Sequence, residues 1–63
     1  MAERLLQYYT YITDELGMEG KVRLAQETKI PAAVAAVAPD SQINLETFRA
    51  AVERLTGEPA PQF

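Results

Sequence analysis

The sequence predicts an all-α protein, a small bundle of four short helices within one domain over residues 1–57. Three observations predict this fold class. Large apolar residues recur at steps of three and four, which is the spacing of one face of a helix. Glycine and proline separate the apolar segments and stand where helices end. No segment alternates apolar and polar residues as a half-buried strand would.

The first predicted helix covers residues 3–16 and stops at Gly17. Its apolar residues follow one another at steps of four, three and four, which places them on one stripe. The residues of this stripe are Leu5, Tyr9, Ile12 and Leu16. Tyr8 and Tyr11 widen the stripe on one side and Leu6 on the other, to an arc of roughly 220° where about 100° covers one face. The first helix therefore carries more apolar surface than one neighbouring helix can cover.

A second helix is expected from residue 19 or 20 to Thr28. Its inward face consists of Val22, Leu24 and Ala25. Glu19 and Arg23 stand four residues apart, with the acid first, which favours an ion pair along the helix.

The segment from Ile30 to Pro39 carries no polar side chain. Pro31 suits the first turn of a third helix, where no amide hydrogen is needed, and Pro39 ends that helix by Val37 or Ala38. We interpret this short alanine and valine helix as part of the core. The alternative is that this helix forms a surface on which another helix packs closely. Both interpretations are compatible if one face packs inward and the other face contacts a second copy of the chain.

The last predicted helix is capped by Asn44 and ends at Gly57. Ile43 and Phe48 have the spacing of a hydrophobic staple across its start. Its inward stripe consists of Leu45, Phe48, Val52 and Leu55. Residues 58–63 are expected to form a disordered C-terminal tail unless a partner holds them.

The composition narrows the function classes. A chain of 63 residues buries too little surface to be very stable, and without cysteine or histidine it has no disulfide and no ordinary zinc site to help, so self-association is expected. The same inventory lacks the usual nucleophile and base pairs, so we expect no enzyme, no cofactor, no metal and no small-molecule substrate. The longest apolar run is too short for a membrane span, and the start of the chain does not resemble a secretory signal, so we expect a cytoplasmic protein.

Several short segments resemble the phage-repressor and Cro type of helix-turn-helix domain, over roughly residues 3–58. They are residues 14–18, 24–31 and 44–48, followed by Leu55-Thr56-Gly57. In this sequence Lys29 stands where the family has its turn glycine, and Ala32 to Val37 replaces the polar helix that reads the major groove. The resemblance implies a helix-turn-helix arrangement with a degenerate recognition helix.

The most specific expectation is a small non-enzymatic interaction module, regulatory in role, that pairs with a second copy or with another protein. The expected interface residues are Leu6, Tyr8, Tyr11, Val34 and Val37. The alternative that the resemblance implies is a DNA-binding transcriptional regulator, with Lys21, Arg23 and Lys29 on phosphate. A net charge of −3 disfavours nucleic acid as a partner, because DNA binding needs an excess of basic residues on one face.

Overall fold

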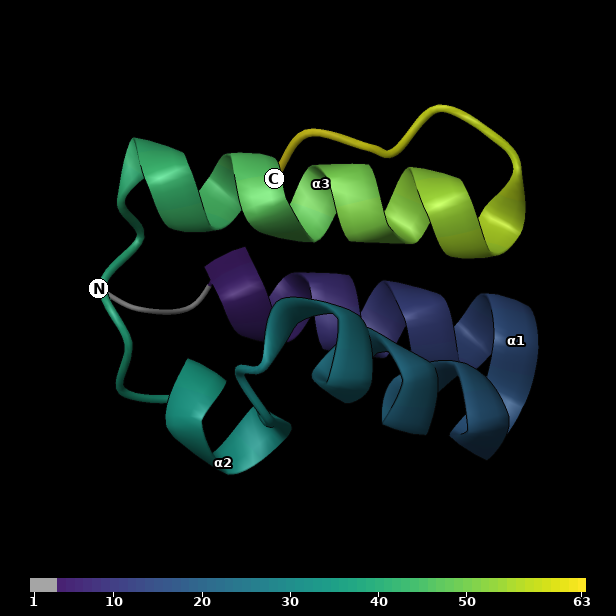
Figure 1. The fold of residues 1–63 in the computed structure, drawn as a ribbon, viewed down its shortest axis with the longest axis horizontal. Coiled ribbons are helices and arrows are strands. Elements are labelled where there is room, and N and C mark those ends of the chain that lie inside the picture. The colour runs from purple at the N-terminus through teal and green to yellow at the C-terminus, as the bar shows by residue number, and fades with distance from the viewer. Residues whose placement is uncertain (1–3) are drawn as a thin grey trace.

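The computed structural model describes residues 4–63 and contains three helical elements in the order α1, α2, α3 (Figure 1). Helix α1 spans Arg4–Thr28, α2 spans Ala32–Ala35 and α3 spans Gln42–Thr56. The described residues contain no strand, so the predicted all-α class is confirmed. The expected four short helices are not, because the residues of the first two belong to one element, α1. The expected start at residue 3 lies outside the described residues.

Helix α1 reverses its direction at Gly17. This residue has φ 76° and ψ −162°, a backbone conformation that is open almost only to glycine. Figure 1 shows the chain after this point running back alongside the chain before it. We call residues 4–16 the first arm of α1 and residues 18–28 the second arm. The helix end expected at Gly17 coincides with this non-helical residue, which divides α1 into two helical arms.

The two arms are in contact at Gly20, which is buried. A Cβ atom at this position would lie 2.5 Å from the Cβ atom of Leu16 and 3.2 Å from the carbonyl oxygen of Ile12. Real side chains do not come this close, so only glycine permits the approach of the arms.

The first arm lies between α3 and the second arm, and its apolar stripe fills the space between them (Figure 1). The buried apolar residues form one cluster: Leu5, Tyr8, Tyr9, Ile12, Leu24, Ala35, Leu45, Phe48, Ala51 and Val52. Most of the two predicted stripes belong to it. The exceptions are Leu55, which is partly buried against the cluster, and Leu16, which is exposed at the end of the first arm. The inward position predicted for Val22 is wrong, because this side chain is exposed on the second arm.

Helix α3 begins one turn earlier than expected. Ser41 is its N-cap, and the Ser41 hydroxyl accepts a hydrogen bond from the backbone N–H of Asn44 at 3.1 Å. The cap predicted at Asn44 is wrong, since its side-chain amide instead donates to the carbonyl oxygen of Pro39 at 3.0 Å. The predicted staple is also wrong, because Ile43 lies inside the first turn with its side chain exposed. The end at Gly57 is confirmed: its φ is 74° and its N–H donates to the carbonyl of Glu53.

The apolar segment from Ile30 to Pro39 forms only the four-residue helix α2. Pro31 is its N-cap rather than its first helical residue, and α2 ends at Ala35, before the expected end. Ala35 is fully buried, whereas Val34 and Val37 are exposed. One side of the segment therefore belongs to the core, and the other side is an apolar surface.

After Gly57 the chain turns back along α3, as the yellow segment of Figure 1 shows. We call residues 58–63 the tail segment. Ala60 packs against the core cluster, and its N–H donates to the Glu53 carboxylate at 3.2 Å. The structure thus gives the tail segment a defined position on the helices, while the disorder expected for it stays a prediction about its motion.

Candidate functional site

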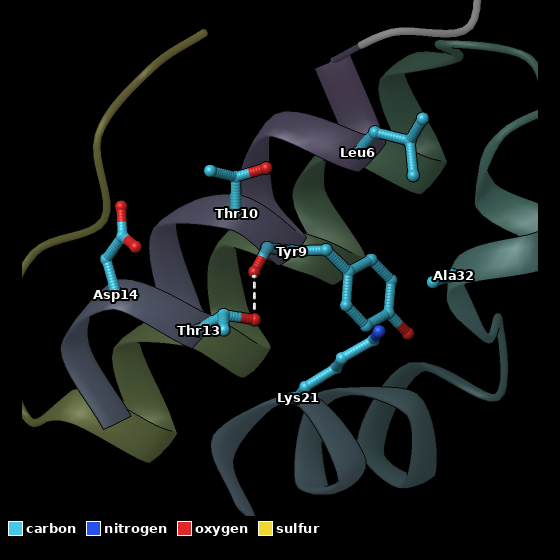
Figure 2. Close-up of a pocket in the computed structure, with 7 residues that line it drawn as sticks. All are labelled: Leu6, Tyr9, Thr10, Thr13, Asp14, Lys21 and Ala32. Atoms are coloured by element: carbon cyan, nitrogen blue, oxygen red, sulfur yellow. Dashed lines mark hydrogen bonds between the residues drawn. The ribbon is translucent and has the colours of Figure 1, made fainter. Parts of the chain in front are cut away.

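A groove of about 350 Å³ lies between the two arms of α1 and the start of α2 (Figure 2). We call it the α2 groove. Its lining residues are Leu6, Tyr9, Thr10, Thr13, Asp14, Lys21 and Ala32. Leu6 and Ala32 give it apolar walls, and the Lys21 side chain extends toward the Tyr9 side chain in the close-up. The groove combines an apolar interior with one cation and one carboxylate, which suits an apolar side chain of a partner better than a small charged ligand.

Tyr9 anchors the α2 groove to the chain that follows α1. Its hydroxyl donates a hydrogen bond to the carbonyl of Ile30, which fixes the end of the second arm against the first arm. Burial raises the pKa of the Tyr9 phenol above its ordinary value of 10.0, and a hydrogen bond with the Thr28 side chain opposes part of this change. The Thr13 hydroxyl in the same groove donates to the carbonyl of Tyr9 at 2.8 Å (Figure 2). These two hydroxyls are therefore used in holding the fold.

A second groove of about 350 Å³ lies on the other side of the first arm. We call it the tail groove. Its lining residues are Gln7, Thr10, Tyr11, Asp14 and Phe63. Thr10 and Asp14 line both grooves, so they form a ridge between them. The Phe63 ring meets the Tyr8 ring edge-on, with centroids 4.9 Å apart, and the Tyr11 ring at 6.3 Å.

The five expected interface residues do not share one surface. Tyr8 is 1% exposed and belongs to the core, beneath the tail segment, and its hydroxyl donates to the carbonyl of Pro61 at 2.8 Å. Leu6 and Tyr11 are half-buried and line the α2 groove and the tail groove, respectively. Val34 is 46% exposed and Val37 is 79% exposed on the outward side of the α2 region. The surplus apolar arc of the first arm is thus partly covered by the chain itself.

The three basic residues considered for DNA are not brought together. Lys21 lines the α2 groove, whereas Arg23 lines a different pocket, between the second arm and Leu55 of α3. The predicted ion pair between Glu19 and Arg23 is confirmed at 3.2 Å, but both side chains are exposed and the pair adds little stability. Lys29 is exposed just after α1, with φ 60°.

Two features were not predicted. The first is the docking of Phe63, for which the only sequence signal is the pair of tyrosines three residues apart on the first arm. The second is an exposed apolar pair on the second arm, Met18 and Val22, at the spacing of neighbours on one helix face. The periodicity of the second arm was too weak to show which face would be covered.

Within residues 4–63, none of the helices is both long and apolar enough to cross a membrane. Comparison with known protein families, with curated proteins and with solved structures finds no match to this chain.

Proposed function

We propose that this chain is a small protein-interaction module that pairs with a second copy through the outward side of the α2 region. The observation that carries this proposal is the exposure of Val34 and Val37 within a segment that has no polar side chain. A run of exposed residues without a polar side chain supports an interaction surface, because large exposed apolar patches mark interaction sites on proteins. Neither valine belongs to the core cluster, which contains Ala35 and is contacted by Ala32 and Ala38.

The small residues around the two valines favour a close approach. Ala33 and Ala36 are also exposed, so the outward side of the α2 region carries only alanine and valine. Side chains this short allow the backbone of a partner to come near, and full burial of each valine contributes roughly 1.5–3 kcal/mol. A standard interface of about 800 Å² per partner would cover about a fifth of the 3986 Å² accessible surface.

The α2 groove is a concave surface next to the outward side of the α2 region. Ala32 belongs to α2 and also lines the groove, opposite Leu6. In a two-fold dimer the same patch must fit itself, so a ridge beside a groove is a suitable arrangement. We expect Val37 of each copy to lie in or near the α2 groove of the other. Leu6 is then an interface residue, in agreement with the expectation from its position on the first arm.

The test is sedimentation equilibrium of the purified chain and of Val37→Glu. We expect the wild-type chain to form dimers and the variant to dissociate, with association weakened by about 1–3 kcal/mol. Met18→Glu is the matched control, because Met18 is similarly exposed, at 70%, but lies on α1. A wild-type chain that stays monomeric at millimolar concentration, with its helical circular dichroism intact, would overturn the proposal.

A further inference from the structure

We propose that the tail groove, together with Tyr8 beneath it, is a binding site for a proline-containing peptide with an aromatic residue two positions after its last proline. The occupant is the tail segment of this chain, which behaves as an exchangeable ligand of the helical body. This proposal is independent of the α2 surface, because the ridge of Thr10 and Asp14 separates the tail groove from the α2 groove.

The first contact that supports the site is the hydrogen bond from the Tyr8 hydroxyl to the carbonyl of Pro61. It joins residues 53 positions apart, and it is the kind of contact by which aromatic grooves hold proline-rich peptides. Proline carbonyls are available for such a bond because these segments have few internal hydrogen bonds. The Tyr8 ring is held in place from below by Phe48, with ring centroids 6.2 Å apart. Tyr8 is therefore a rigid donor that faces the tail segment.

The second contact is aromatic. Phe63 approaches both Tyr8 and Tyr11 edge-on, at interplanar angles of 69° and 63°, which is a favourable arrangement of aromatic rings. The Phe63 side chain is still 39% exposed, and the groove beside it extends to Gln7 and Asp14. The site thus binds the ring along one side and leaves the other side open, as expected for a ligand that enters and leaves.

The tail segment is held by separate contacts at individual residues and not by a helix or strand. Besides the contacts of Pro61 and Phe63, the Glu58 backbone bonds to the Thr56 hydroxyl and the Ala60 N–H donates to the Glu53 side chain, whereas Pro59 and Gln62 are exposed. Ordering a non-helical segment costs conformational entropy, which the two prolines reduce because they restrict the free chain. For a segment held in this way, the free energy of detachment is much lower than the free energy of unfolding of the whole domain. Its release uncovers Tyr8.

The test uses the 63-residue chain with Phe63→Ala, labelled with ¹⁵N, and the acetylated peptide Glu-Pro-Ala-Pro-Gln-Phe as ligand. We expect the peptide to shift the amide resonances of Gln7 and Tyr11 saturably. The wild-type chain should need an at least tenfold higher peptide concentration, because its own tail segment competes at an effective concentration of about millimolar. The control peptide ends in alanine and should produce no saturable shift. The control protein is Gln62→Ala, which keeps the aromatic contact and should respond like the wild type.

A Tyr8→Phe substitution in the Phe63→Ala chain keeps the ring and removes only the hydroxyl. We expect it to weaken peptide binding about fivefold or more, as the loss of one hydrogen bond does. A folded Phe63→Ala chain that does not respond to the peptide would overturn the proposal. If this variant does not fold, hydrogen exchange of the wild-type chain decides. An Ala60 amide that exchanges at least tenfold faster than the amides of α3 supports an exchangeable segment, and equal protection overturns it.

Discussion

Lys29 has a backbone conformation that lysine rarely adopts. Its φ of 60° is the only positive value outside glycine among the described residues, and its N–H closes the end of α1 by donating to the carbonyl of Ala25 at 2.8 Å. The left-handed conformation places Cβ close to the following carbonyl, which costs roughly 1–2 kcal/mol for a residue that is not glycine. The backbone here thus has the geometry suited to glycine, although the residue is lysine.

Lys29→Gly should therefore stabilise the protein. The relief of strain exceeds the entropy that glycine adds to the unfolded chain, and we expect the free energy of unfolding to rise by about 0.5–1 kcal/mol. Urea unfolding monitored by circular dichroism measures this change. Lys29→Ala is the control, because it removes the charge and keeps Cβ, so its stability should stay close to that of the wild type. A glycine variant less stable than the alanine variant would contradict the argument.

The buried phenol of Tyr9 is expected to lower the stability of the protein at high pH. Burial raises the pKa of its phenol in the folded state, whereas the unfolded chain loses the proton near pH 10. The folded state then binds more protons than the unfolded state above about pH 10, so stability falls as the pH rises from there toward the folded pKa, and Tyr9 contributes no change below about pH 9.

Urea unfolding of the wild type and of Tyr9→Phe at pH 8 and at pH 10.5 tests this expectation. The variant lacks the hydroxyl, so it should lose less stability between the two pH values than the wild type loses. At pH 8 it should be less stable by about 1 kcal/mol, because the hydrogen bond to Ile30 is gone. Identical pH dependence of the two proteins would show that the Tyr9 phenol does not titrate differently on folding.

At the scale of the elements, α1 is a reversed pair of arms within one helical element. Gly20 is the contact point, and its missing Cβ would meet Leu16 and the backbone of Ile12. On an exposed helix, changing glycine to alanine stabilises by up to about 1 kcal/mol. At Gly20 the steric conflict dominates, and we expect Gly20→Ala to destabilise the protein by about 1–3 kcal/mol.

Thermal and urea unfolding of Gly20→Ala measure the sign of this effect. Gln26→Ala is a matched control, because Gln26 is exposed on the same arm and its substitution changes helix propensity without a contact. A Gly20→Ala protein more stable than the wild type would mean that the arms separate without cost.

Element by element, the sequence predicted the parts of the fold that depend on strong local signals. The stripes of the first arm and of α3 have strict helical spacing, and Gly57 ends α3 as expected. The cap of α3 was not predictable, since Ser41 and Asn44 are both good caps and the choice depends on which residue has an extended backbone. Ser41 has this conformation, with φ −73° and ψ 157°. The prediction for Val22 on the second arm was wrong, because a short segment with few large apolar residues does not determine which of its faces is buried.

At the scale of the whole molecule, the sequence predicted that the first arm has more apolar surface than one helix covers. It did not predict that the tail segment covers part of this surface. The contact between Tyr8 and Pro61 joins the two ends of the chain, and no local pattern encodes a contact over such a separation. Leu6, Val34 and Val37 stay candidates for an interface because the described chain leaves them partly or largely accessible. The residues of the candidate site were thus partly predictable, and their division between two grooves required the tertiary structure.

Salt separates the two proposed kinds of partner. Apolar self-association through α2 should persist or strengthen when sodium chloride is raised from 50 to 500 mM, as apolar burial does in salt. The alternative, a DNA-binding regulator with Lys21, Arg23 and Lys29 on phosphate, predicts an affinity for duplex DNA that falls steeply over the same range. Sedimentation equilibrium and a fluorescence-anisotropy titration with labelled duplex measure the two responses. Dimers that dissociate at high salt would contradict an apolar interface.

The reversal at Gly17 also sets an order of events during folding. Contacts between the two arms join residues close in the sequence, and such short loops close in well under a microsecond. The bond between Tyr8 and Pro61 must wait for a far larger loop to close, with a greater loss of chain entropy. The hairpin of α1 should thus nucleate folding, while the last six residues attach at the end of the process and detach first when denaturation begins.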